Sequence, residues 1–191
     1  MDITEIVIRN SADWVQVYDQ CQNLKIDKIT VDSKAFWNND GLDVVDCKDV
    51  KITNSFIDAT DDAICFKSHD ATKMCENVEV RNCVARSSAN GIKFGTVTSG
   101  GYKNFRIINN KVYDTFRSAI TLATPDGGVM LGRPELFDIV RLNDYLPNPS
   151  RPPESGGRLP EPPDTMTPER RQKLLSGEEA VSFEDAQRIL S

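Results

Sequence analysis

Val50-Lys51-Ile52-Thr53-Asn54 belongs to a set of short stretches that alternate apolar and polar residues and that decide the fold. The other stretches are residues 6–10 (IVIRN), 24–28 (LKIDK), 78–82 (VEVRN) and 105–109 (FRIIN). Their first residues are 18, 26, 28 and 27 positions apart. Alternation with a period of two predicts half-buried strands, so the spacing indicates five imperfect repeats over residues 6 to about 124.

Each later repeat also contains a second pair of apolar residues with one residue between them. These pairs are Leu42/Val44, Ile64/Phe66, Ile92/Phe94 and Ile120/Leu122. Repeats of this length, with several short strands and no helical periodicity, favour a parallel β-helix in which each coil buries its apolar face against its neighbours. We therefore predict an all-β, right-handed parallel β-helix of about five coils.

Two further columns support this fold. The residues three before each repeated stretch are Cys21, Cys47, Cys75 and Tyr102, and the residues one before it are Asn23, Asp49, Asn77 and Asn104. Stacked asparagines can hydrogen-bond to one another along a β-helix, so we expect the second column to form a side-chain ladder. We interpret the cysteines as buried, stacked free thiols, because their number is odd and no connectivity is determined.

The character of the chain changes near residue 130. No proline precedes Pro125, whereas residues 147–163 hold seven, which favours an extended linker because proline donates no backbone hydrogen bond. Thr167-Pro168 and Ser182 resemble helix starts. We predict a parallel β-helix over residues 1–130 and a proline-rich, partly helical tail over 131–191 of unknown function.

The net charge of -6 argues against a protein that binds duplex nucleic acid, since phosphate binding requires a basic surface. We recognise neither a membrane span nor a secretion signal, and we expect neither nucleic acid nor membrane as a partner. Met1 leads within a few residues into a repeating strand, whereas a solenoid needs a cap at its end. We interpret the sequence as an internal fragment of a longer β-helix.

Aligning the coils brings acidic residues together. Asp40, Asp62, Asn90 and Ser118 form one column, and Asn39, Asp61, Ala89 and Arg117 form the next. Like charges one coil apart, about 4.8 Å, repel, so at least one pKa is expected to rise and leave a protonated carboxyl beside an ionised one, as glycoside hydrolysis requires. Asp40, Asp61 and Asp62 are the candidate catalytic residues. The alternative is that β-helix turns favour Asp and Asn because these side chains satisfy local backbone groups.

The motifs on successive coils resemble glycoside hydrolase family 28, the polygalacturonase-like pectin hydrolases. The resemblance covers Ile6 to Met130, and the family pattern is Asn-Thr-Asp, Asp-Asp, Gly-His-Gly and Arg-Ile-Lys. The first two motifs fall on residues 38–40 and 61–62, the third on residues 89–91, and the fourth near residues 121–123. Asn90 replaces the histidine of the third motif, and Thr121-Leu122-Ala123 lacks the arginine and lysine of the fourth.

The resemblance implies inverting hydrolysis of a pectic or related polysaccharide. Asp61 would be the general acid, and Asp40 and Asp62 would hold the water as general base. We expect no cofactor and no metal ion. The full-length parent is expected to be a monomer and to be secreted or periplasmic.

Basic and amide side chains supply candidate substrate contacts. Two columns of residues alternate with the apolar pairs and should face outward, namely Asp43/Cys65/Lys93/Thr121 and Val45/Lys67. We hypothesise that Lys67, Lys93 and Arg117 line one groove and bind a carboxylate or sugar hydroxyls, with Asn38 and Asn90 as further contacts. The alternative is ordinary solvated surface charge. His69 is expected in a solvated loop, and Trp37 either packs or stacks on a sugar ring.

Two other functions remain open. In a calcium-dependent pectate lyase, Asp40, Asp61 and Asp62 would be hard oxygen ligands of the metal, and a lysine or arginine would abstract the proton. The second alternative is a degenerate β-helix that binds polysaccharide without turnover or has a structural role only.

Overall fold

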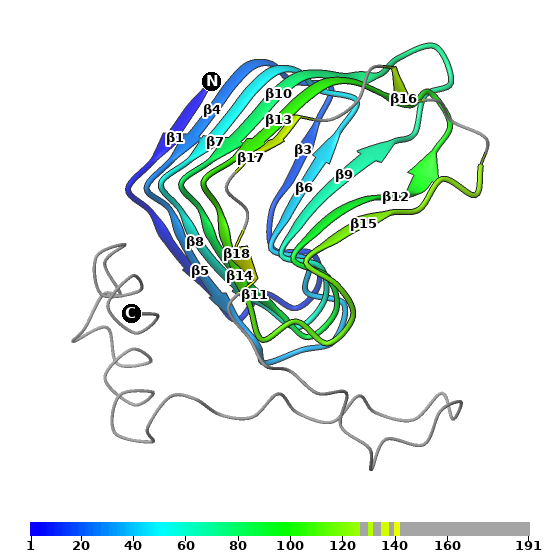
Figure 1. Ribbon diagram of the computed structural model, residues 1–191. Coiled ribbons are helices and arrows are strands. Elements are labelled where there is room, and N and C mark those ends of the chain that lie inside the picture. The colour runs from blue at the N-terminus through cyan, green and yellow to red at the C-terminus, as the bar shows by residue number, and fades with distance from the viewer. Residues whose placement is uncertain (127–129, 132–134, 138–139, 142–191) are drawn as a thin grey trace, which may run out of the picture.

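A computed structural model describes residues 1–126, 130–131, 135–137 and 140–141, which wind into a parallel β-helix (Figure 1). All strand pairings in these residues are parallel and join the strands into three sheets. The described residues contain no helix. The predicted all-β solenoid is confirmed.

Successive strands pass from sheet A to sheet B to sheet C and back to sheet A. Sheet A holds β1 (Asp2–Thr4), β4 (Gln22–Asp27), β7 (Lys48–Thr53), β10 (Cys75–Arg81), β13 (Tyr102–Ile108), β16 (Met130–Leu131) and β17 (Glu135–Phe137). Sheet B holds β2 (Val7–Arg9), β5 (Thr30–Ser33), β8 (Phe56–Ala59), β11 (Val84–Ser87), β14 (Lys111–Tyr113) and β18 (Val140–Arg141). Sheet C holds β3 (Val17–Asp19), β6 (Leu42–Val45), β9 (Ile64–Ser68), β12 (Ile92–Thr98) and β15 (Ile120–Leu122). Four full turns separate β1 from β13.

The first coil differs from the predicted alignment. Residues 6–10 were expected to stack on residues 24–28, but Ile3 pairs with Ile26 in sheet A, and Val7–Arg9 pair with β5 in sheet B. The prediction that the repeats begin at Ile6 is therefore wrong, because the first coil already begins with β1. A short apolar-polar-apolar stretch fits either sheet, and the backbone pairing selects between them.

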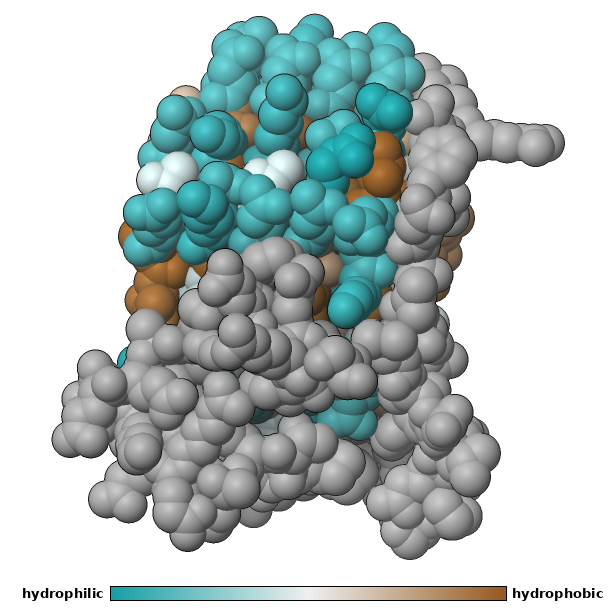
Figure 2. All heavy atoms as spheres, turned by 60° about the vertical axis from the view of Figure 1, so that its left-hand side comes forward, coloured by the Kyte–Doolittle hydropathy of each residue, from teal (hydrophilic) through white to brown (hydrophobic). Residues whose placement is uncertain are grey.

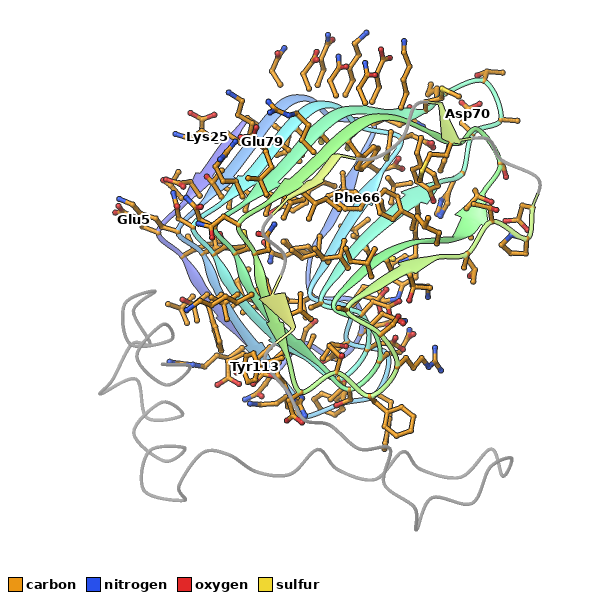
Figure 3. The ribbon with its side chains drawn as sticks, viewed as in Figure 1. Glu5, Lys25, Phe66, Asp70, Glu79 and Tyr113 are labelled. Atoms are coloured by element: carbon orange, nitrogen blue, oxygen red, sulfur yellow. The ribbon has the colours of Figure 1, made fainter. Side chains whose placement is uncertain are left out.

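Alternate side chains of the strands fill the interior. The apolar pairs of sheet C, including Leu42 and Val44, belong to the same buried cluster as Val50 and Ile52 of sheet A. Phe66 points into this interior (Figure 3). Its ring centroid lies 5.3 Å from that of Phe94 and 5.0 Å from that of Phe105. Burying one such side chain contributes about 1.5–3 kcal/mol, so the predicted alternation directly yields the core.

The predicted asparagine ladder is present on sheet A. Asn77 Nδ2 donates to Asp49 Oδ1 at 2.8 Å, and Asn104 Nδ2 donates to Asn77 Oδ1 at 3.0 Å. The same column has positive φ angles, 55° at Asn23, 58° at Asp49, 57° at Asn77 and 56° at Asn104. Asparagine and aspartate tolerate this conformation better than other non-glycine residues. All five cysteines are free thiols, and all are buried except the half-buried Cys21.

Three short strands follow the β15 coil. β16 and β17 pair with β13, and β18 pairs with β14. The division between residues 130 and 131 stays a prediction, and the predicted linker and helices of residues 147–190 lie outside the described residues. Within the described part of the chain, no helix is long and apolar enough to span a membrane.

Candidate functional site

The candidate acids lie where the chain enters sheet C. The strands of this sheet stack in the register Asp43, Cys65, Lys93, Thr121, as the sequence predicted. Backbone hydrogen bonds continue this register into the preceding turns, from Gly41 N to Asp62 O at 2.8 Å and from Ala63 N to Asn90 O at 2.9 Å. Residues that are far apart in sequence therefore occupy equivalent positions on neighbouring coils.

The three predicted catalytic acids come together. One oxygen from each carboxyl of Asp40, Asp61 and Asp62 lies within 4.8 Å of the others. Their accessibility differs, because Asp40 is 4% exposed and Asp62 is 1% exposed, whereas Asp61 is half-buried. Asp61 is the acid that a substrate reaches most easily.

Asp62 is held by Asn90 and Lys93. Its Oδ1 accepts hydrogen bonds from the backbone N of Asn90 at 3.2 Å and from Asn90 Nδ2 at 2.6 Å, and its Oδ2 accepts from Lys93 Nζ at 2.7 Å. Asn90 Oδ1 in turn accepts from Ser118 Oγ at 3.2 Å and from Thr121 Oγ1 at 2.6 Å. Asn90 is 2% exposed, so in this structure it orients Asp62 and has little surface left for a substrate.

Lys67 links Asp40 to a fourth acid, Asp43. Lys67 Nζ lies 2.9 Å from Asp40 Oδ2 and also donates to Asp43 Oδ1. The same ammonium lies 4.0 Å from the centroid of the Trp14 ring, which is a cation–π distance. Lys67 is only 5% exposed. Lys67 lies on the outer face of sheet C, as the alternation predicted, but it is not a solvated surface charge, because Trp14 and the acids cover it.

Asp43, Cys65 and Trp14 take part in this cluster although the sequence did not select them as site residues. Asp43 is 0% exposed, and its Oδ2 has no hydrogen-bond partner among the described residues. Cys65 is also fully buried. Alternation with the apolar pair Leu42/Val44 had placed Asp43 in the Lys93 column, and this was the available signal. The alternation in sheet C gave no such signal for Trp14, because Trp14 lies outside the strands of that sheet and reaches Lys67 only in the folded structure.

Burial and like charges raise the pKa of the acids. The pKa of Asp40 rises to about 8, mainly because of burial and then because of Asp43, while Lys67 opposes the rise. Burial, followed by the Asp62 charge, also raises the pKa of Asp61, and Lys93 and Arg117 oppose it. The expectation that at least one acid keeps its proton near neutral pH is therefore supported.

The other predicted contacts lie around this cluster. Asn38 is exposed and donates from Nδ2 to Asp13 Oδ1 at 2.6 Å. Its neighbour Asn39 is buried and donates from Nδ2 to the Asp13 carbonyl at 2.8 Å. Arg117 is exposed. Trp37 is 45% exposed, and His69 is exposed as expected.

Two groups of side chains in the described residues have ligand atoms close enough for one cation. They are Asp40/Asp61/Asp62 and Asp40/Asp43/Cys65, each with the atoms within 4.8 Å of one another. Oxygen ligands alone, as in the first group, suit calcium. Lys67 and Lys93 already pair with Asp40 and Asp62, so a metal ion would compete with two ammonium groups.

A comparison with known proteins identifies the family of the chain. The model of the glycosyl hydrolases family 28 matches residues 1–120, which include all of the candidate acids. No curated protein and no solved structure matches the chain.

Proposed function

Because the chain belongs to glycosyl hydrolases family 28, we propose that it hydrolyses O-glycosidic bonds of a pectin-like polysaccharide at Asp40, Asp61 and Asp62. The family itself implies a glycoside hydrolase with such a substrate. The observation that carries the assignment to these residues is the convergence of three carboxyls within 4.8 Å, one of which is accessible.

Asp61 is the general acid in this proposal. A general acid must hold a proton at the working pH and reach the leaving oxygen. Burial and the neighbouring Asp62 raise the pKa of Asp61, and its half-buried carboxyl is the most accessible of the three. These two properties are those that distinguish the acid from the base in a pair of catalytic carboxyls.

Asp62 and Asp40 hold the attacking water. Lys93 and Asn90 fix the orientation of Asp62, so Asp62 accepts the proton of the water, while Asp40, with a pKa of about 8, orients the water through its own proton near neutral pH. We retain the inverting outcome that the resemblance implies. The oxygens lie closer than the separation of about 6.5–9.5 Å typical of inverting enzymes, so the water would sit beside the acids rather than between them.

The substrate contacts divide into two groups. Lys67, Lys93 and Asn90 organise the acids, because their polar atoms already bond to Asp40 and Asp62. Arg117 and Asn38 are exposed and are the better candidates for contacts with the sugar chain. Arg117 also acts on Asp61, since its charge lowers the pKa of that carboxyl.

Hydrolysis by the full chain tests the proposal. Release of reducing ends from polygalacturonate and related polysaccharides is expected for the wild type and is expected to fall about 10²–10⁴-fold in Asp61→Asn, with substrate binding retained. Asp19→Asn, an exposed acid at the end of β3, is the matched control. Unchanged activity in Asp61→Asn would exclude its role as the acid. The anomeric configuration of the first product, followed by NMR, separates inversion from retention.

Non-catalytic polysaccharide binding is the second candidate. It is favoured by the burial of Asp40 and Asp62, which are 4% and 1% exposed, and by the replacement of the expected histidine with Asn90. Binding without reducing ends or unsaturated product would support it. An unsaturated, ultraviolet-absorbing product that a chelator abolishes would instead indicate lyase chemistry at the three acids.

A further inference from the structure

The outer face of sheet A contains a groove that is separate from the carboxyl cluster on sheet C. Its volume is about 660 Å³, and it crosses β4, β7, β10 and β13. Its floor consists of the backbone at four core residues whose side chains point inward, namely Leu24, Val50, Val78 and Phe105. Figure 2 brings this side of the molecule forward and shows hydrophobic patches between bands of hydrophilic residues.

Two parallel rows of polar residues border the groove. One row is the ladder of Asn23, Asp49, Asn77 and Asn104, and the other is Lys25, Lys51, Glu79 and Arg106. The second row is in register across the sheet, because Lys25 pairs with Lys51, Lys51 with Glu79, and Glu79 with Arg106. Lys25 and Glu79 project from the outside of the sheet (Figure 3). Each coil therefore presents one ladder residue and one residue of the second row to the groove.

Lys25 and Lys51 form an unfavourable pair within the fold. Both are exposed, they lie directly opposite each other on neighbouring strands, and neither forms a salt bridge within the described residues. Like charges at directly opposed positions destabilise a sheet. Both lysines belong to a chain with a net charge of -6, and Glu79, the next residue of their row, is already paired with Arg81 and Arg106. An anion bound between the two ammonium groups would relieve their repulsion.

We propose that this groove binds one extended strand of an anionic polysaccharide that runs along the stack of coils. Neighbouring coils are about 4.8 Å apart, which is comparable to the length of one sugar residue in an extended chain. Successive carboxylates of a polyuronate then meet Lys25 and Lys51 on neighbouring coils. Glu79 and Arg106 on the following coils pair with each other and take no part in this charge recognition. Charge-assisted hydrogen bonds from lysine and arginine suit carboxylates.

The remaining groove residues suit the uncharged parts of such a ligand. Asn77 and Asn104 are exposed and carry amide groups beside the groove, which can donate to and accept from sugar hydroxyls. Because the groove lies on a different sheet from Asp61, this binding does not depend on turnover at the acids.

Binding of a fluorescent oligogalacturonate to the full chain provides the test. The measurement uses the Asp61→Asn background, so that the probe stays intact whether or not the wild type hydrolyses it. The double variant Lys25→Gln/Lys51→Gln is expected to weaken binding about 5- to 30-fold, as two lost ion pairs imply. Lys28→Gln/Lys111→Gln removes the same charge outside the groove and is expected to leave affinity within about twofold.

Two further readouts keep the outcome clear. A neutral galacto-oligosaccharide is expected to bind more weakly than the anionic probe. In urea unfolding, Lys25→Gln/Lys51→Gln should be at least as stable as its background, because the repulsion between the two ammonium groups is removed. Equal affinity in the groove variant and its background, or an equal loss in the control variant, would overturn the proposal. So would equal binding of the neutral and anionic probes. Loss of hydrolysis in Asp61→Asn alone concerns the proposed function and leaves this result unaffected.

Discussion

Replacing Lys67 with methionine tests whether one ammonium group holds the buried acids in place. The variant keeps an unbranched apolar side chain but removes the Nζ that lies 2.9 Å from Asp40 Oδ2 and also pairs with Asp43. Asp40 is 4% exposed and Asp43 is 0% exposed, so water cannot replace the lost cation. Breaking a buried ion pair by removing one partner costs about 3–5 kcal/mol. Because two carboxylates share this lysine, we expect Lys67→Met to lose about 3–5 kcal/mol of unfolding free energy near pH 9, where Asp40 is ionised in the wild type.

The loss should depend on pH. In the wild type the folded-state pKa of Asp40 is raised to about 8, whereas an unperturbed aspartate titrates near about 3.9. The folded state therefore binds this proton more tightly than the unfolded state does, so the contribution of Asp40 to stability falls as the pH rises from about 4 to 8. Lys67 opposes this rise in pKa, and removing it raises the pKa further. Below about pH 7 Asp40 keeps its proton in both folded proteins, so the stability difference between variant and wild type should change little there. It should grow as the pH rises through about 8, where the wild type ionises Asp40 and the variant does not.

Urea unfolding at pH 6 and pH 9 measures the difference, with circular dichroism as the global probe. Tryptophan fluorescence reports locally, because the Trp14 ring lies 4.0 Å from Lys67 Nζ. Lys51→Met, at an exposed lysine, is the control and should change stability by less than about 0.5 kcal/mol. Adding Asp43→Asn to Lys67→Met should recover about 1–3 kcal/mol. A loss at pH 9 no larger than that of the control, or one that does not grow between pH 6 and pH 9, would refute the reasoning.

Three other changes test the site, the core and a second asparagine stack, formed by Asn54, Asn82 and Asn109. Arg117→Gln removes a charge that lowers the pKa of Asp61, so the alkaline limb of the hydrolysis rate should move to higher pH; a shift to lower pH in a pH–rate profile would contradict this. Phe66→Ala empties a fully buried position between Phe94 and Phe105 and should cost about 3–5 kcal/mol in urea unfolding, whereas a loss below about 1 kcal/mol would show that the core collapses around it. Asn82 has a φ of 55° and donates a hydrogen bond of 3.1 Å to Asn54, so Asn82→Ala should cost about 1–3 kcal/mol of unfolding free energy. Asn82→Gly should cost less, because glycine tolerates a positive φ. A larger loss in Asn82→Gly than in Asn82→Ala would contradict this role of the φ angle.

The later coils could be predicted closely because their sequence is redundant. The pairs Leu42/Val44 and Ile64/Phe66 repeat the same alternation, and their predicted register matches the observed pairing. The first coil was misaligned, because residues 6–10 satisfy the same apolar pattern in either sheet. Only the pairing of Ile3 with Ile26 places β1 in sheet A, and this choice depends on backbone hydrogen bonds that no residue pattern records.

The sequence by itself determined the solenoid and the stacking of Asp40 on Asp62, because strand alternation and repeat length fix which positions become neighbours. The tertiary structure decided what those acids touch. It placed Trp14 over Lys67 and paired Lys67 with Asp40 and Asp43, contacts that the sequence did not predict for this lysine. The physical reason is that column position depends on the backbone, whereas the protonation and accessibility of a carboxyl depend on desolvation and on long side chains that reach across coils.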